Sequence, residues 1–188
     1  RDAVTQGPGK INANFLAKYL ETFDLLNGWL ATTTGTYGTN YRQRAIVDKV
    51  GLGAPMPWVS LYPVALFDRT KAPLTGTKRY VAHFSPETSR PPVRFFWSMT
   101  LYDNDGFLVD NEFDRYLIND RSKPNYNEDG SLDIYVQPDK PADPRQARNW
   151  LPSPPATSAT RGFRLITRLY GLSDKGIKGV VDGTGWHG

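Results

Sequence analysis

Residues 94–103 read RFFWSMTLYD and alternate between two kinds of side chain. A strand directs successive side chains to opposite faces, so a period of two predicts a β-strand with one buried face. The tripeptide that follows, Asn104-Asp105-Gly106, lies between two apolar runs and predicts a tight turn. The expected core positions of this strand are Phe95, Trp97, Met99 and Leu101.

The same alternation recurs in two segments further along the chain. In 131–137 and 163–170 every second residue is mostly apolar, with Leu132, Ile134, Val136, Phe163, Leu165, Thr167 and Leu169 at the expected core positions. Glu128-Asp129-Gly130 predicts a second tight turn, and 68–77 predicts a longer hairpin loop. The predicted strands are 60–67, 79–85, 94–103, 106–110, 115–118, 131–137 and 163–170.

The N-terminal part of the chain shows a helical period instead. Apolar residues recur at steps of three or four over 11–31, at Ile11, Phe15, Tyr19, Phe23, Leu26 and Leu30. This spacing predicts an amphipathic helix that packs on a sheet or a partner domain. A second helix is expected over 40–50, with Gly51 as its stop.

The Pro-rich segment 138–162 predicts a long loop or strap with a helical turn near 144–148. Short strands separated by turns, without strand–helix alternation, predict a mainly β fold: a jelly-roll-like antiparallel β-sandwich with one or two N-terminal helices. We expect one domain, divided into an N-terminal helical segment (1–59), the sandwich (60–171) and a Gly-rich tail (172–188).

Composition excludes several classes of function. The chain has 188 residues, 39% of them hydrophobic and 13% aromatic, and a net charge of +4. The scattered basic residues give no nucleic-acid signature. No apolar run is long enough to span a membrane, and the absence of cysteine excludes disulfides and thiolate sites. The chain starts at Arg1, so we expect a processed or truncated piece, with export or the periplasm favoured over the cytoplasm.

The second face of the predicted strands is polar and aromatic. If the strands share a sheet, that face predicts a site for a polar, glycan-like ligand, because rings stack on a sugar while charged groups bond its hydroxyls or carboxylates. The alternative is a face that is solvated, or covered by a helix or a neighbouring domain. The candidate contacts are Thr100, Tyr102, Asp133, Tyr135, Arg164, Arg168 and Tyr170, with Trp150 either at the rim or buried as a core plug.

Catalytic and metal sites have weaker support. Asp110 and Asp133 are candidates for the acid and base of a hydrolase; the alternative is that such carboxylates pair with Arg115, Arg121 or Arg168. His83 and His187 are the only histidines, and their spacing does not predict a metal site. The acidic run after residue 103 does not match a calcium loop. We expect no cofactor and no metal.

Several segments together resemble the bacterial family called domain of unknown function 1214. They are FFWSMTLYDNDGFLVDN (95–111), RYLINDRS (115–122), NEDGSLDIYVQ (127–137), NWLPSPP (149–155) and FRLITRLYG (163–171), and NGWLATTTGTYGTNYRQRA (27–45) fits the start of the family. The resemblance implies a jelly-roll-type sandwich, similar in architecture to peptide-N-glycosidase-type glycan amidases. It also implies an upstream module, domain of unknown function 1254. It carries no catalytic residues to this chain.

Three functions follow as hypotheses. The first is a non-catalytic module that binds a polar, glycan-like ligand or a partner domain. The second is a carbohydrate- or amide-processing hydrolase that uses the Asp pair. The third is a structural module that assembles, with itself or with a partner, through the helix predicted over 11–31.

Overall fold

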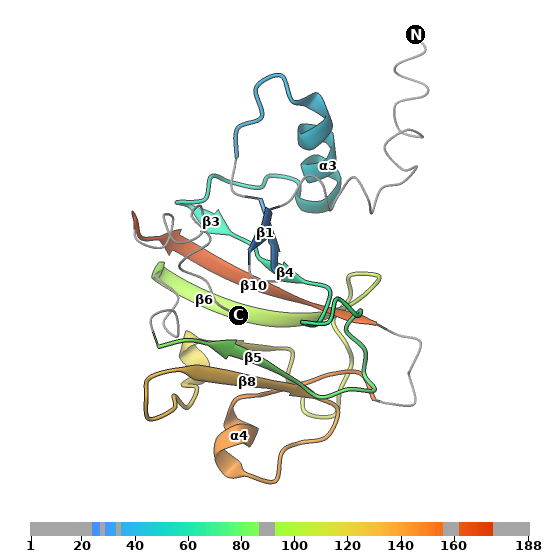
Figure 1. Ribbon diagram of the computed structural model, residues 1–188, viewed down its shortest axis with the longest axis vertical. Helices are drawn as coiled ribbons and strands as arrows, with labels where there is room; N and C mark the ends of the chain where they lie inside the picture. The colour runs from blue at the N-terminus through green and yellow to red at the C-terminus, as the bar shows by residue number, and fades with distance from the viewer. Residues whose placement is uncertain (1–23, 27–28, 33–34, 87–92, 156–161, 175–188) are drawn as a thin grey trace.

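The computed structural model describes residues 24–26, 29–32, 35–86, 93–155 and 162–174. Its strands form two β-sheets that face one another (Figure 1). In chain order the elements are β1 (Asp24–Leu26), β2 (Trp29–Ala31), α3 (Tyr41–Gly51), β3 (Ser60–Leu61), β4 (Val64–Ala65), β5 (Tyr80–Phe84), β6 (Val93–Asp103), β7 (Leu117–Asn119), the 3-10 helix η1 (Asp120–Ser122), β8 (Leu132–Gln137), α4 (Pro144–Arg148), β9 (Trp150–Pro152) and β10 (Phe163–Leu172).

The larger sheet has seven strands in the order β1-β2-β4-β10-β6-β7, and β3 also pairs with β10. The smaller sheet has the order β5-β8-β9. The pairs are antiparallel except for β8 and β9, which run parallel. The predicted class, a mainly β sandwich with an N-terminal helix, is confirmed.

The core lies between the two sheets. It is built by the alternate residues of β6, β8 and β10 that the sequence pattern predicts, and Met99, Ile134 and Leu169 are fully buried there. Burying one face of each sheet removes apolar surface from water and holds the sheets together.

Phe95 is the exception among the predicted core positions, because 74% of it is exposed. The register between β6 and β10 shifts between Tyr170 and Leu172. Gly171 has φ +68°, and a Cβ at Gly171 would meet the Phe95 ring at 2.6 Å. A bulge with a positive-φ glycine interrupts the alternation here, so Phe95 lies over the glycine and outside the core.

The helix predicted over 11–31 is wrong where the structure describes it. Asp24–Leu26 and Trp29–Ala31 are strands that pair with one another, and Leu30 also pairs with Val64 of β4. Pairing with the sheet outweighs the local helical period. Residues 11–23 lie outside the described residues. The second helix is confirmed as α3, which begins where the Asn40 side chain accepts a hydrogen bond from the Gln43 amide at 3.1 Å.

Four strand predictions are confirmed in β5, β6, β8 and β10, and 115–118 corresponds to β7 in part. The 60–67 strand is divided into β3 and β4 at Tyr62-Pro63. No strand forms over 106–110, where a single bridge joins Tyr102 to Leu108. The loop 68–77 does not join two paired strands, because it connects β4 of one sheet to β5 of the other, although an antiparallel bridge between Phe67 and Pro73 closes a short turn at its start.

The two predicted turns are confirmed, with φ +95° at Gly106 and +85° at Gly130. In the Pro-rich segment, α4 is the helical turn predicted near 144–148, whereas strand β9 was not predicted.

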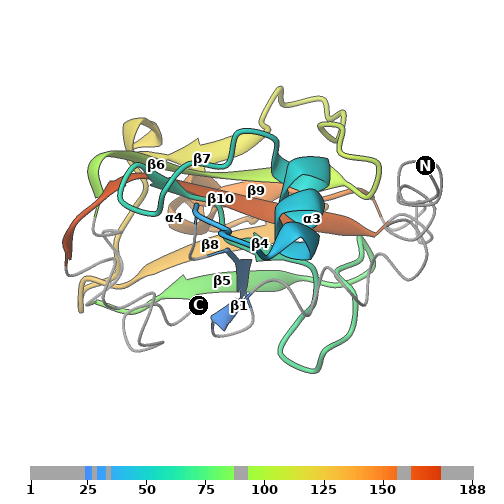
Figure 2. The same cartoon turned by 90° about the horizontal axis from the view of Figure 1, so that it is seen from above.

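Helix α3 lies against the outer face of the larger sheet, over β4 and β10 (Figure 2). Its residues Ile46 and Val47 are buried. On that same outer face, Ser98 and Thr100 of β6 are also buried. Helix α3 therefore lies over part of the outer face of the larger sheet, and the use of that face for a ligand stays a prediction.

Candidate functional site

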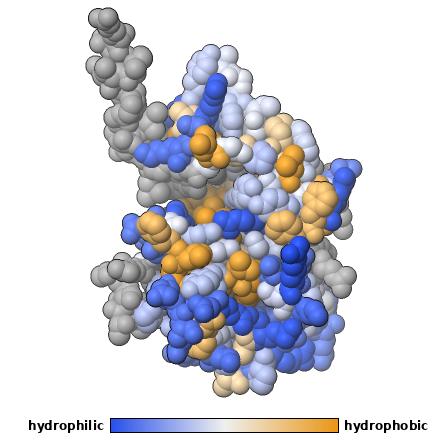
Figure 3. Space-filling view, turned by 180° about the vertical axis from the view of Figure 1, so that it is seen from behind, coloured by the Kyte–Doolittle hydropathy of each residue, from blue (hydrophilic) through white to orange (hydrophobic). Residues whose placement is uncertain are grey.

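A groove runs between α3 and the outer face of the larger sheet. Its cavity volume is about 290 Å³, which is close to the lower limit for small-ligand sites. The lining is mainly aliphatic, with two larger polar side chains; it consists of Thr32, Val47, Gly51, Leu52, Gly53, Ala54, Tyr62, Val64, Ile166 and Arg168. Figure 3 shows apolar residues gathered between the region that contains α3 and the sandwich below it.

Arg168 provides the positive charge of the groove. The period of two in β10 puts Leu165 and Leu169 in the core and turns Arg168 to the outer face. Its Nη2 donates to the Tyr102 hydroxyl at 2.8 Å and its Nη1 to Thr100 Oγ1 at 3.2 Å. The guanidinium carbon also lies 5.5 Å from the centroid of the Tyr102 ring.

The partners of Arg168 are neutral. None of the carboxylates in the described ranges forms a salt bridge with this half-buried guanidinium. A guanidinium has five N–H donors, and the two bonds to Thr100 and Tyr102 fix its orientation while donors remain for a ligand. The predicted pairing of Arg168 with an aspartate does not occur among these residues.

Aromatic residues fix the other polar group of the groove, Tyr62. The Tyr62 and Tyr170 rings pack edge to face with their centroids 6.1 Å apart, and the Tyr170 ring stacks on Phe96 with a centroid distance of 4.3 Å. The Ser60 hydroxyl donates to the Tyr62 hydroxyl at 3.0 Å. A hydrogen bond with Tyr62, and then burial, raises the pKa of Tyr170. Tyr62 therefore presents a hydroxyl held by its neighbours beside Arg168.

The predicted contact residues separate onto two opposite faces. Thr100, Tyr102, Arg164, Arg168 and Tyr170 belong to the larger sheet, as the shared-face hypothesis requires. Arg168 lines the groove. Tyr102 accepts a hydrogen bond from Arg168, and Tyr170 packs edge to face against Tyr62. Arg164 pairs with Tyr102 across the strands, and its buried Nε has no hydrogen-bond partner within the described part of the chain.

Asp133 and Tyr135 lie on β8 in the smaller sheet, so they cannot join the groove. Asp133 accepts from Asn127 Nδ2 at 2.9 Å, and its other oxygen is 2.6 Å from His83 Nδ1. Asp110 lies in an exposed loop after β6, and no hydrogen bond links it to Asp133 among the described residues. The acid–base pair therefore stays a prediction.

Trp150 is 1% exposed on β9, which fits a plug better than a stacking platform. Its indole nitrogen donates to the Gln137 carbonyl at 2.8 Å. The Phe113 ring packs edge-on against the Trp150 ring, with the two centroids 4.9 Å apart. Whether Trp150 contacts a ligand stays a prediction.

The sequence analysis did not identify Tyr62 or the part of the groove supplied by α3. The only available signal was the adjacent apolar pair Ile46-Val47 in a short helix, which shows that one face is buried but not against which strand. Among the residues that the structure describes, no three His, Cys, Asp or Glu side chains gather as a metal site requires. No helix in this part of the chain is long and apolar enough to cross a membrane.

Comparison with known proteins identifies the family of this chain and two structures similar to it. The family described as protein of unknown function (DUF1214) matches residues 59–174, and the chain therefore belongs to it. The VPA0106 protein from Vibrio parahaemolyticus is similar in structure, with a TM-score of 0.62 and 25% identity over 94% of this chain. A putative uncharacterized protein from Burkholderia cenocepacia has a TM-score of 0.41 and 12% identity over 92% of this chain.

The chain spans 41% of the length of the Vibrio protein and 39% of the Burkholderia protein. No curated protein matches this sequence. The comparisons do not show the upstream module that the resemblance implies, so that partner stays a prediction.

Proposed function

We propose that this chain is a binding module that holds a small, carboxylate-bearing ligand in the groove beneath α3. The observation that carries the proposal is Arg168: its guanidinium is fixed by two neutral oxygens and has no carboxylate partner among the described residues. An arginine held in this way is prepared for a bidentate bond to a carboxylate.

The lining narrows the ligand class further. Val47, Val64 and Ile166 offer aliphatic walls, and Tyr62 offers a hydroxyl near the charge. Aromatic faces suited to sugar stacking are few here, because Tyr170 is already stacked on Phe96. The groove therefore favours an organic acid with a short apolar part over a neutral glycan. An acidic sugar should bind with an affinity between those of the two.

The proposal is tested by titrating the full chain with hexanoate, glucuronate and glucose while amide chemical shifts are recorded. We expect saturable shifts in α3 and β10 with hexanoate, weaker ones with glucuronate and none with glucose. The loss of one charge-assisted interaction costs about 1.5–3 kcal/mol, so Arg168→Gln should weaken hexanoate binding roughly 10- to 100-fold.

Two further variants separate binding from folding. Ala54→Phe fills the groove without changing Arg168 and should also abolish binding. Arg44→Gln removes a charge from the exposed surface of α3, outside the lining, and should bind like the unchanged chain. Equal affinity for hexanoate and glucose, or unchanged affinity in both Arg168→Gln and Ala54→Phe, would refute the proposal.

A further inference from the structure

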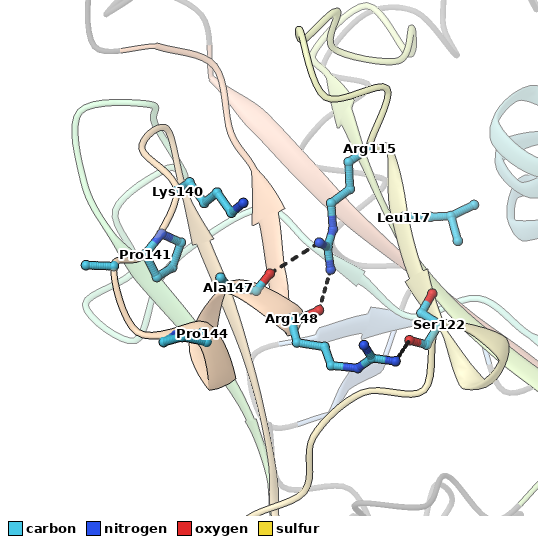
Figure 4. Close-up of a pocket in the computed structure, with 9 residues that line it drawn as sticks. Arg115, Leu117, Ser122, Lys140, Pro141, Pro144, Ala147 and Arg148 are labelled. Atoms are coloured by element: carbon cyan, nitrogen blue, oxygen red, sulfur yellow. Dashed lines mark hydrogen bonds between the residues drawn. The ribbon is translucent and has the colours of Figure 1, made fainter.

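A second cavity lies at the other end of the fold, where α4 packs beside β7 and η1. Its volume is about 660 Å³. Three of its lining residues are cationic and none is a carboxylate; the lining consists of Arg115, Leu117, Ser122, Lys140, Pro141, Ala142, Pro144, Ala147 and Arg148. Figure 4 shows the Lys140 ammonium and the Arg115 guanidinium extending toward one another.

Both arginines are held by neutral groups. Arg115 donates to the carbonyls of Ala147, at 3.2 Å, and of Arg148. Arg148 in turn donates from Nε to the Lys123 carbonyl at 2.7 Å and from Nη2 to the Ser122 carbonyl at 3.4 Å. These bonds fix the two guanidinium groups without neutralising their charge, and each keeps unused N–H donors.

Three acidic residues that neighbour the cavity along the chain have partners of their own, and the first, Asp114, accepts a hydrogen bond from the Tyr116 hydroxyl at 3.2 Å. Asp139 pairs with Arg79 at 3.7 Å, and Asp143 accepts a hydrogen bond from the Arg145 amide at 2.8 Å. Lys140 forms no salt bridge with any residue that the structure describes. Burial, and then the charge of Arg148, lowers the pKa of Arg115, as expected where cations gather without an anion.

We propose that this cavity binds a small dianion of the phosphate monoester class, with its oxygens between Arg115, Lys140 and Arg148. A phosphate monoester carries about −1.5 to −2 charges at neutral pH and three acceptor oxygens, which match three cations from separate segments of the chain. Fixed guanidinium groups bind such oxygens through paired N–H donors, whereas Lys140 adds a mobile point charge. Leu117, Pro141 and Pro144 leave an apolar wall for the organic part of the ligand.

The test uses the full chain and inorganic phosphate as the probe, with chloride and acetate at matched ionic strength as comparisons. We expect saturable amide shifts at Ser122, Ala142 and Ala147 with phosphate, and much smaller ones with the two monoanions. A charge-assisted hydrogen bond is worth about 1.5–3 kcal/mol, so Lys140→Gln should weaken phosphate binding by about tenfold or more.

Arg69→Gln is the matched control, because it removes one exposed cation from a loop outside the cavity. Lys140 is exposed and has no salt-bridge partner among the residues that the structure describes, so its variants should fold. Arg168→Gln should leave phosphate binding unchanged, which separates this site from the groove. Equal weakening by Lys140→Gln and Arg69→Gln, or equal shifts with chloride and phosphate, would overturn the proposal.

Discussion

Replacing Asn149 with alanine should destabilise the smaller sheet strongly. The Asn149 side chain is 3% exposed and makes three hydrogen bonds to the backbone. Its Oδ1 accepts from the Asn125 amide at 2.7 Å, and its Nδ2 donates to the carbonyls of Asn125 at 2.6 Å and Asp133 at 2.9 Å. The residue therefore joins the loop before β8, strand β8 and the start of β9.

The size of the effect follows from these three bonds. A net hydrogen bond contributes about 1 kcal/mol, and a buried group left without a partner costs about 1–3 kcal/mol. Asn149→Ala removes all three bonds, so we expect a loss of about 3 kcal/mol in the free energy of unfolding. The Tm of a domain of this size changes by about 2–4 °C for each kcal/mol of unfolding free energy. The expected fall in Tm is therefore roughly 6–12 °C.

The assay is urea unfolding followed by tryptophan fluorescence, with thermal unfolding followed by circular dichroism. Asn125→Ala is the control: it deletes the same side-chain amide but removes only an exposed bond to the Arg145 carbonyl at 3.2 Å. The free energy of unfolding of that variant should fall by no more than about 0.5 kcal/mol. Asn149→Asp keeps the acceptor but points a carboxylate at two carbonyls, so it should not restore stability.

If Asn149→Ala and Asn125→Ala have the same stability, the three buried bonds do not hold these segments together and the reasoning fails. An unchanged transition midpoint with a changed urea slope would also contradict it, because a changed slope reports a change in the surface exposed on unfolding and not the loss of these bonds.

Two other perturbations test separate parts of the fold. Gly171→Ala should cost about 1–3 kcal/mol in thermal unfolding, because the backbone has φ +68° and the new methyl group would meet Phe95; Phe95→Ala in the same chain should recover part of the loss, and no recovery would contradict the clash. Hydrogen bonds from a neighbouring threonine hydroxyl and from Lys78 lower the pKa of Asp68. Its contribution to stability is therefore present above the ordinary aspartate pKa and is lost as the pH falls below it. Asp68→Asn should flatten that acid-side decline in a series of urea midpoints, and an unchanged decline would count against the pairing.

The residue pattern alone determined which side chains of the long strands are buried. Trp97, Ile134 and Leu165 alternate with residues that are mostly polar, and only one face of a half-buried strand can meet the core. The tight turns at Gly106 and Gly130, and helix α3, were also predicted, because glycine and asparagine favour these local conformations whatever surrounds them. Asn27-Gly28 is a turn-forming dipeptide, which is a sequence signal against one continuous helix over 11–31.

Only the tertiary structure decided which strands became neighbours. A period of two says which face is buried but not which strand lies alongside, so β8 and β10 have the same pattern and belong to opposite sheets. That separation removed Asp133 and Tyr135 from the predicted ligand face and joined Asp133 to His83 instead. Both cavities depend on contacts between residues far apart in the chain, since α3 must reach β10 for the groove and α4 must reach Arg115 for the cationic cavity. Such pairings are set by the packing of the whole domain, and a local sequence pattern does not encode them.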